Sequence, residues 1–300
     1  MADRRKFLKN ASALAISGLL FPGCAATAIT SGRNLGSIGI QLWSVKDVIE
    51  KDLKGTLQQL ATIGYKEIES YPGEKGHYYG LAPKEFKALL DGMGLTLVSS
   101  HFGSGAKTGK SGSWQQATML QNFEELAGKA AETGQKYLTC AWMDESLRKT
   151  PEDLKQTAAL FNKTGEICKK AGLQFAYHNH DFEFKKVGDV MLYDYMIENT
   201  DPALVQWEMD IYWVAAGGQD PLAYFKKYPN RFPLGHVKDM DKQDKTKNTE
   251  IGSGSLNFPE LLKAAQAAGM KHFIVEQESF TRPSIESMKM NYDYLSKLAV

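Results

Sequence analysis

Short apolar and β-branched runs alternate with longer stretches of helical periodicity along most of the chain. Leu53, Leu57 and Leu60 recur at helical spacing, and Gly64 ends this first helix. The pattern predicts eight strands, at residues 37–42, 65–69, 95–101, 136–141, 173–178, 204–209, 232–237 and 272–275. It predicts the further helices at 83–90, 114–133, 151–172, 187–199, 221–228, 258–268 and 283–298.

Eight strand–helix units follow one another within residues 37–300, with no shift in composition between them. Such a series predicts an α/β fold, a single (β/α)8 TIM barrel, which takes about 250 residues. A doubly wound open sheet is the alternative, but no glycine-rich phosphate-binding fingerprint follows the first strand. The Gly- and Ser-rich stretches at 103–113 and 252–255 each lie between a strand and the next helix, so we expect loops on the active face.

The first residues have the three parts of an export signal. A basic segment with Arg4 and Arg5 precedes an apolar stretch at 11–21, and small residues follow. The paired arginines resemble a twin-arginine signal, which is an address read by a receptor. We therefore expect residues 1–28 to be a signal peptide and residues 29–300 to form the barrel domain of a periplasmic protein. A cytosolic amphipathic helix is the alternative.

The three cysteines bear on processing and on metal binding. Cleavage after Ala28 fits the small-residue rule, whereas cleavage before Cys24 would leave a lipid on this cysteine as the only membrane anchor. Cys24, Cys140 and Cys168 are too few and too scattered for a disulfide framework or a cysteine zinc site.

Composition narrows the class of protein. Of 300 residues, 43% are hydrophobic and 24% are charged, and the net charge is +1. Removal of residues 1–28 takes away four basic residues and one acidic residue, which leaves 32 against 34 and a net charge of −2. A faintly acidic domain argues against a nucleic-acid partner, because such binding needs a basic surface. The mean hydropathy of −0.36 and the lack of an apolar run of ~20 residues exclude a polytopic membrane protein.

Chemically capable side chains stand at the ends of most predicted strands. The active site of a barrel lies at the carboxyl ends of its strands, so these side chains are expected to converge on one cavity. Carboxylates and imidazoles end six of the eight strands. In chain order, the candidates are Gln41, Glu69, His101, Trp142, His178 with His180, Glu208 with Asp210, His236 with Lys238, and Glu276 with Glu278.

Three of these side chains form a candidate metal site. Asp210, His236 and Glu276 directly follow three consecutive apolar strands. Carboxylate and imidazole ligands suit one divalent cation, such as Mn²⁺, Zn²⁺, Co²⁺ or Mg²⁺. His178 and His180 are two residues apart at a strand end and point the same way, so one would complete the metal shell while the other binds substrate.

Lys238 shares a strand face with His236 and is a candidate for catalysis and for substrate binding. A partly buried lysine serves as an acid or base, or holds an oxyanion. The equally weighted alternative is a solvated lysine that pairs with Asp239 or Asp241.

Further candidates for substrate binding are Gln41, Glu69, His101 and Trp142. For Glu69 and His101, a polar plug in the mouth of the barrel is the alternative. Tryptophans near strand ends suit the flat faces of a sugar, and they suit ordinary packing equally well.

Six pieces of the sequence stand at strand ends, at 64–69 (GYKEIE), 99–101 (SSH), 177–180 (YHNH), 209–210 (MD), 235–239 (GHVKD) and 274–276 (IVE). Together they resemble the xylose isomerase-like barrel superfamily, often labelled sugar phosphate isomerase/epimerase. The likeness runs from about Ile38 to the end of the chain. Its members include ketose epimerases, aldose and hydroxyacid isomerases, inosose and dehydroshikimate dehydratases, keto-glycoside lyases and apurinic endonucleases, so the resemblance implies the fold more specifically than the reaction.

The resemblance also implies a ligand set, from which this sequence departs once. Epimerase members hold their metal by Glu, Asp, His and Glu, and the last three positions match Asp210, His236 and Glu276. The first position is His178 here. In the epimerases two metal-bound glutamates handle protons on opposite faces of the substrate. With His178 in one place, a lyase, a dehydratase or a one-base isomerase becomes the alternative to a 3-epimerase.

For the isomerases, epimerases, dehydratases and lyases of this superfamily, the resemblance implies proton abstraction next to a carbonyl, with the metal stabilising the charge that develops. Glu276 or Glu208 is the expected base, and His101, His180 or Lys238 the expected acid. We therefore expect a metal-dependent isomerase or epimerase.

The expected substrate is a free sugar or keto-sugar, because phosphorylated sugars are scarce outside the cytoplasm. A lyase or dehydratase that acts on a 3-keto-glycoside is the alternative, and a non-catalytic periplasmic carbohydrate-binding barrel is an alternative of another class. A nuclease is opposed by the charge balance and the export signal.

Overall fold

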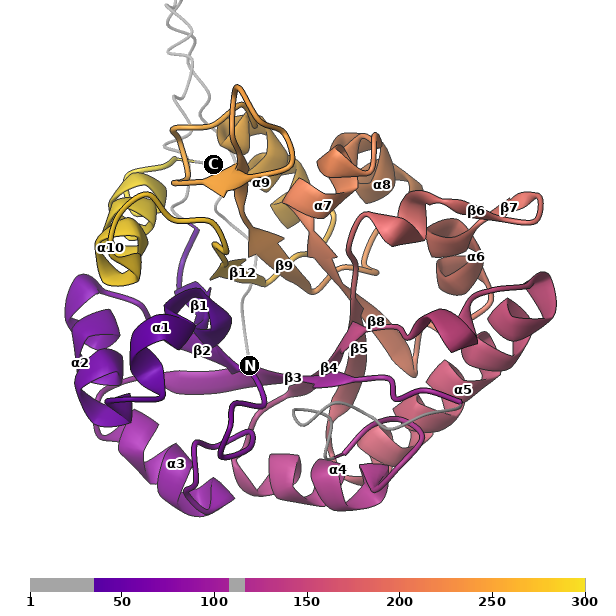
Figure 1. Ribbon diagram of the computed structural model, residues 1–300, viewed down its shortest axis with the longest axis horizontal. Helices are drawn as coiled ribbons and strands as arrows, with labels where there is room; N and C mark the ends of the chain where they lie inside the picture. The colour runs from indigo at the N-terminus through magenta and orange to yellow at the C-terminus, as the bar shows by residue number, and fades with distance from the viewer. Residues whose placement is uncertain (1–34, 108–116, 300) are drawn as a thin grey trace, which may run out of the picture. The chain divides into compact units, whose positions relative to one another are not determined.

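A computed structural model of the chain describes residues 35–107 and 117–299, which contain a closed barrel of eight parallel strands (Figure 1). The strands follow one another around the barrel in the order β1-β12-β9-β8-β5-β4-β3-β2. The predicted single (β/α)8 barrel is therefore confirmed. The strands are β1 (Ile38–Gln41), β2 (Glu67–Ser70), β3 (Thr96–Gly103), β4 (Tyr137–Trp142), β5 (Gln174–His178), β8 (Val205–Asp210), β9 (Leu234–Val237) and β12 (His272–Val275).

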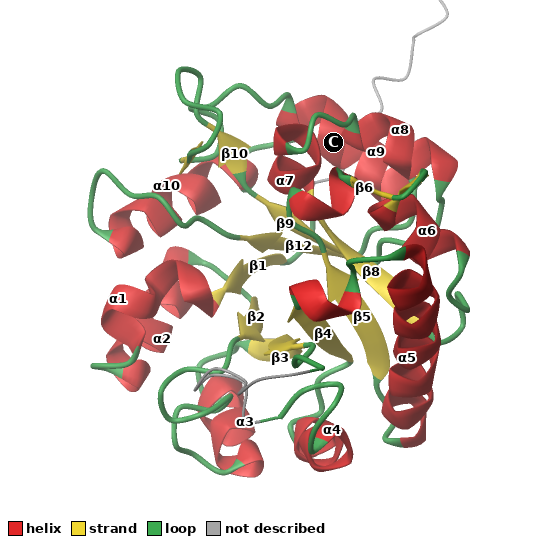
Figure 2. Cartoon of the chain, turned by 45° about the vertical axis from the view of Figure 1, so that its right-hand side comes forward, coloured by secondary structure: helices red, strands yellow, loops and turns green. Residues whose placement is uncertain are grey.

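Helices surround the barrel on its outside (Figure 2). The longer ones are α2 (Leu53–Ile63), α3 (Pro83–Asp91), α4 (Phe123–Glu132), α5 (Pro151–Lys170), α6 (Leu192–Glu198), α8 (Pro221–Lys227), α9 (Phe258–Ala267) and α10 (Ser284–Leu295). Short elements decorate the loops: α1 (Lys46–Ile49), α7 (Ile211–Ala216), and the paired strands β6 (Lys186–Val187) with β7 (Val190–Met191) and β10 (Asp239–Met240) with β11 (Asn248–Thr249).

The start of α5 shows how local sequence sets a helix boundary. The Thr150 hydroxyl accepts the backbone N–H of Asp153, and the Asp153 carboxylate accepts the backbone N–H of Thr150, at 3.1 and 3.0 Å. This reciprocal cap satisfies backbone donors that the first turn leaves free. Pro151, which has no N–H to satisfy, occupies the first helical position.

Two predicted helix starts were wrong. The helix expected from residue 114 begins at Phe123, because Asn122 adopts a left-handed conformation (φ 56°) that helical backbone does not continue through. The helix expected from 187 begins at Leu192. Val187 pairs with Val190 across a two-residue turn that starts with Gly188 (φ 62°), so a short hairpin precedes the helix.

The interior of the barrel changes from apolar to polar along its axis. Leu234 and Ile274 belong to a buried apolar cluster inside the barrel. Two residues further along the same strands stand His236 and Glu276, which face the same interior because side chains alternate along a strand. The period-2 pattern therefore closes one end of the barrel with hydrocarbon and fills the other end with ionisable groups.

The N-terminal segment and the hydropathy of the helices bear on export and on membrane association. Residues 1–28, the expected signal peptide with Cys24, lie outside the described residues. Among residues 35–107 and 117–299, no helix has the length and apolar character that crossing a bilayer requires.

Candidate active site

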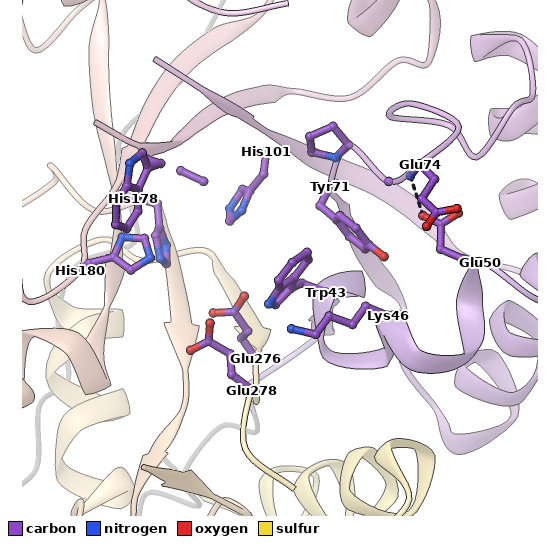
Figure 3. A pocket seen from close by; sticks show the side chains of 14 residues that line it. Trp43, Lys46, Glu50, Tyr71, Glu74, His101, His178, His180, Glu276 and Glu278 are labelled. Atoms are coloured by element: carbon purple, nitrogen blue, oxygen red, sulfur yellow. Dashed lines mark hydrogen bonds between the residues drawn. The ribbon is translucent and has the colours of Figure 1, made fainter. Parts of the chain in front are cut away.

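A pocket of about 580 Å³ lies where the strands end (Figure 3). Its lining includes Trp43 after β1, Tyr71 after β2, His101 on β3, Trp142 on β4 and Glu276 after β12. The carboxyl ends of the strands thus converge on one cavity, as the barrel fold requires.

Beneath the pocket lies a buried network centred on Glu69. Its Oε2 accepts a hydrogen bond from Gln41 Nε2 at 2.9 Å, and it lies 2.7 Å from His236 Nε2 and 3.0 Å from His101 Nε2. His101 Nε2 is also 2.8 Å from Glu208 Oε2. Gln41, Glu69 and Glu208 do not line the pocket, so among these residues only His101 faces it.

Proximity sets the ionisation of this network. Burial opposes the ionisation of Glu69, but His101 and His236 outweigh it and hold the pKa of Glu69 well below its usual range. Burial also lowers the pKa of His101, but Glu69 and Glu208 outweigh this effect and raise it to about 9. Burial together with the charge of Glu69 raises the pKa of Glu208 to about 7. Glu69 is therefore the ionised carboxylate of the network, and its charge is stabilised by His101 and His236.

Four candidate metal ligands come together beside this network. His178, Asp210, His236 and Glu276 each offer one ligand atom, all within 4.8 Å of one another, and all four side chains are buried. His101, His178, Glu208 and His236 form an overlapping set with the same spacing. We favour the first set as the ion site, because it contains Asp210, His236 and Glu276, the three ligands predicted from the sequence.

The residues of the first set fit a divalent cation. Asp210 caps α7 through Oδ1, which accepts the Trp213 N–H at 3.0 Å. Its Oδ2 is buried without a hydrogen-bond partner, although Lys238 Nζ lies 2.9 Å away. His178 Nδ1 is also buried without a hydrogen bond, although Glu208 Oε2 lies 3.2 Å away. Mixed nitrogen and oxygen donors of this kind suit the ions expected from the sequence.

Lys238 occupies the centre of a buried ion cluster. Its Nζ lies 2.6 Å from Glu276 Oε2, 2.9 Å from Asp210 Oδ2 and 3.0 Å from Glu278 Oε2. Burial alone would lower the pKa of Lys238, but these three carboxylates raise it well above its usual range. The same ammonium and His236 outweigh the burial of Glu276 and hold the pKa of that carboxyl well below its usual range. The alternative of a solvated Lys238 paired with Asp239 or Asp241 is wrong, because Lys238 is fully buried.

Asp239 instead holds the loop that follows β9. Its carboxylate accepts the backbone N–H groups of Gly252 and Gly254 at 2.9 and 3.0 Å, and also those of Met240 and Leu256. A Cβ on Gly254 would lie 2.3 Å from Asp239 Oδ1, so only glycine fits there. The Gly- and Ser-rich run seen in the sequence is therefore the partner of a buried carboxylate, a role that our reading of the sequence missed.

The two histidines after β5 have different surroundings. His178 belongs to both ligand sets, whereas His180 lines the pocket with its Nδ1 unpaired. His180 is flanked by Trp142 and Trp213, with ring centroids 5.2 and 5.6 Å away. Burial, followed by the charge of Lys238, lowers the pKa of His180 to about 3. His180 therefore offers an uncharged imidazole to the pocket.

Glu183 is a further residue that the strand-end rule did not find. Its Oε2 accepts the His180 backbone N–H at 2.8 Å, and its Oε1 accepts the Tyr177 hydroxyl at 2.5 Å. Burial raises the pKa of Glu183 to about 7. It follows β5 by several residues, and it fixes the turn that presents His180.

Loop residues complete one wall of the pocket. Lys46, Glu50, Tyr71 and Glu74 line it, although none of them ends a strand. Trp43 and Trp142 are 38% and 39% exposed, which is unusual for large apolar side chains. Trp142 is a substrate-binding candidate predicted from the sequence, and Trp43 is another tryptophan near a predicted strand end.

The architecture matches proteins of known family. A profile described as xylose isomerase-like TIM barrel matches residues 57–298. The inosose dehydratase of Lacticaseibacillus casei is 26% identical over 259 residues, which cover 78% of this chain and 85% of that protein. A solved structure of a sugar phosphate isomerase/epimerase from Parabacteroides distasonis is 31% identical, with coverages of 91% and 96% and a TM-score of 0.72. A second structure so named, from the same organism, is 29% identical, with coverages of 87% and 98% and a TM-score of 0.75. The family profile spans most of the barrel, and the chain belongs to the xylose isomerase-like TIM barrel family.

Proposed function

We propose that this protein is a divalent-metal-dependent enzyme that removes a proton next to the carbonyl of an unphosphorylated keto-sugar, either free or in a glycoside. The observation that carries the proposal is the meeting of His178, Asp210, His236 and Glu276, of which His178 and Glu276 line the pocket. Membership of a family with isomerases, epimerases and dehydratases supports the same chemistry.

A bound divalent ion would polarise the carbonyl and stabilise the negative charge that develops on its oxygen. Glu276 is the best-placed base, because it lines the pocket and Lys238 keeps it ionised. Glu208, the other expected base, is buried beneath the pocket. His180 faces the same space and is placed to hydrogen-bond a substrate hydroxyl. Lys238 acts as a positioning residue behind Glu276.

The charge of the pocket supports an unphosphorylated substrate. Among the described lining residues there is one lysine, Lys46, and no arginine, against the four carboxylates of Glu50, Glu74, Glu276 and Glu278. A phosphoryl group needs cationic or backbone N–H partners, and carboxylates outnumber cationic side chains among these lining residues. The expected export signal at residues 1–28 supports the same choice, and we propose a periplasmic protein on that basis.

Because Glu276 would be the only base, we favour elimination over epimerisation, which uses bases on opposite faces of the substrate. It would take the proton from the carbon next to the carbonyl and hand it to the oxygen that leaves the following carbon. The carbon–hydrogen and carbon–oxygen bonds break, a carbon–carbon double bond forms, and an alcohol or water departs. The similarity to an inosose dehydratase supports this reaction, because a dehydratase eliminates water.

Isomerisation is the second candidate, since two solved structures at about 30% identity are named sugar phosphate isomerase/epimerase. The same carboxylate would then return the proton to a neighbouring carbon. The discriminating experiment incubates metal-supplemented protein with free sugars, 3-keto-sugars, glycosides and sugar phosphates in D2O. Loss of water or aglycone identifies a lyase, whereas deuterium uptake without other mass change identifies an isomerase or epimerase. Turnover of phosphorylated substrates alone would contradict the proposal.

A further inference from the structure

The pocket has two ends of different chemistry (Figure 3). His178, His180 and Glu276 lie at the end where the proposed reaction takes place. Tyr71 lies at the other end, together with the segment around Glu74, and Trp43 stands between the two ends. At about 580 Å³, the cavity falls well within the ~300–1,000 Å³ of pockets that bury drug-sized ligands, so it has room for more than one sugar ring.

Trp43 is held in place and still presents apolar surface to the pocket. Its ring meets that of Tyr71 edge to face, with centroids 5.0 Å apart, and Lys46 Nζ lies 3.7 Å from its ring centroid. Its backbone N–H donates to Gln41 Oε1 at 3.0 Å, which ties it to the network beneath the pocket. Despite these contacts 38% of Trp43 remains exposed. A rigid, partly exposed indole is a surface on which a flat ring packs with little entropic cost.

The loop behind Tyr71 is built to hold this wall. Glu50 Oε1, at the end of α1, accepts the backbone N–H of Glu74 at 3.1 Å. A Cβ on Gly73 would lie 1.7 Å from that same oxygen, so a side chain at this position would displace the Glu50 carboxylate. Tyr79 packs edge to face against Tyr71 with centroids 5.8 Å apart. The outer wall is therefore preformed.

We propose that Trp43, Tyr71 and Lys46 form an aglycone subsite, which binds a second ring joined to the keto-sugar through its glycosidic oxygen. The inference rests on the proposed function and names its substrate class, a glycoside of a keto-sugar. The indole and phenol rings offer apolar contact, while Lys46 offers a hydrogen bond to ring substituents. Both an aromatic aglycone and a second pyranose have the flat face that this wall fits.

Binding measurements test the subsite without any need for turnover. Isothermal titration calorimetry measures the affinity of the metal-loaded protein for three glucosides. Methyl β-glucoside has no ring in its aglycone, 4-nitrophenyl β-glucoside has an aromatic ring there, and cellobiose has a second sugar ring. We expect at least one ring-bearing ligand to bind about tenfold more tightly than the methyl glucoside. Preference for 4-nitrophenyl β-glucoside assigns an aromatic aglycone, and preference for cellobiose assigns a sugar. Equal affinity for all three would overturn the subsite.

Variants connect the preference to Trp43. Trp43→Ala should remove the advantage of the ring-bearing ligand and leave the methyl glucoside within twofold, whereas Trp43→Phe should keep most of it. Met290→Ala, an exposed apolar residue on α10 outside the pocket lining, is the matched control. A preference that persists in Trp43→Ala would also overturn the assignment.

Turnover separates this inference from the proposed function. With 3-keto methyl β-glucoside, deuterium uptake or release of methanol supports the proton-abstraction chemistry and is independent of the subsite. If that substrate reacts but 3-keto 4-nitrophenyl β-glucoside and 3-ketocellobiose have no higher kcat/KM, the subsite fails and the chemistry stands. If none reacts but the ring-bearing glucosides bind more tightly in a Trp43-dependent way, the subsite stands and the chemistry fails.

Discussion

Nζ of Lys238 lies 2.6 Å from Oε2 of Glu276, and both groups are buried at the mouth of the barrel. Removal of the ammonium in Lys238→Met would leave Glu276 and Asp210 as buried carboxylates without their partner. Breaking a buried pair in this way costs about 3–5 kcal/mol. We expect a loss of that order in the free energy of unfolding of the metal-free protein, measured by urea titration.

Added Mn²⁺ should return part of the stability of Lys238→Met, because a cation at the ligand set neutralises the same carboxylates. Lys289→Met is the control, since Lys289 pairs with Asp293 on the exposed face of α10 and should cost less than about 1 kcal/mol. A Lys238→Met protein as stable as the wild type in EDTA would contradict the central role given to this ion cluster.

Asp210→Asn tests the ligand set directly. The wild-type protein should carry one divalent ion per chain after dialysis against Mn²⁺, measured by elemental analysis, and the variant should lose most of it. Asn keeps the shape of the side chain but lacks the charge that draws the cation. Asp91→Asn, on the exposed face of α3, should retain the metal. Equal metal content in both variants would remove Asp210 from the site.

Glu183 predicts a pH dependence of stability. Its pKa is raised in the folded state from 4.5 to about 7, so the folded protein binds this proton more tightly than the unfolded chain does. Stability from this group is complete below pH 4.5 and is lost as pH rises toward 7, by about 3 kcal/mol. The free energy of unfolding of Glu183→Gln, measured relative to wild type, should therefore rise between pH 5 and pH 8. Glu124→Gln, at an exposed position of α4, should show no such trend, and a flat difference for Glu183→Gln would refute the assignment.

Asp239 predicts a local opening. Asp239→Ala removes the acceptor of four backbone N–H groups, so amides of the loop at 240–256 should exchange with deuterium much faster, while those of β9 and β12 keep their protection. Hydrogen exchange read by mass spectrometry checks this. Unchanged exchange in that loop would show that other contacts hold it.

The sequence was sufficient to predict the barrel and the place of its polar groups. The period-2 alternation along β9, from Leu234 to His236 to Lys238, predicts which side chains face the interior, and the strand-end rule then brings His178, Asp210, His236 and Glu276 together. Both predictions follow from the alternation of side chains along each strand and from the position of its end, which can be read from each strand separately.

What the sequence did not predict depends on contacts between distant segments. Lys238 pairs with carboxylates on β8 and after β12, which are distant in the sequence. Its closeness to Asp239 in the sequence therefore suggested the wrong ion-pair partner. Glu183 and Asp239 act through backbone N–H groups, which leave no side-chain pattern. Tyr71 lies in a loop after β2, where periodicity gives no signal, and it meets Trp43 only when the barrel closes.

Proton abstraction by Glu276 next to a sugar carbonyl can be tested in a single NMR experiment. Mn²⁺-loaded protein is incubated with 3-keto methyl β-glucoside in D2O, and the proton at the carbon next to the ketone is followed by NMR beside Glu276→Gln. We expect loss of that proton signal, by exchange or by release of methanol, at a rate at least about a hundredfold lower in Glu276→Gln. An unchanged signal with metal-loaded wild-type protein, or equal rates for the two proteins, would contradict it.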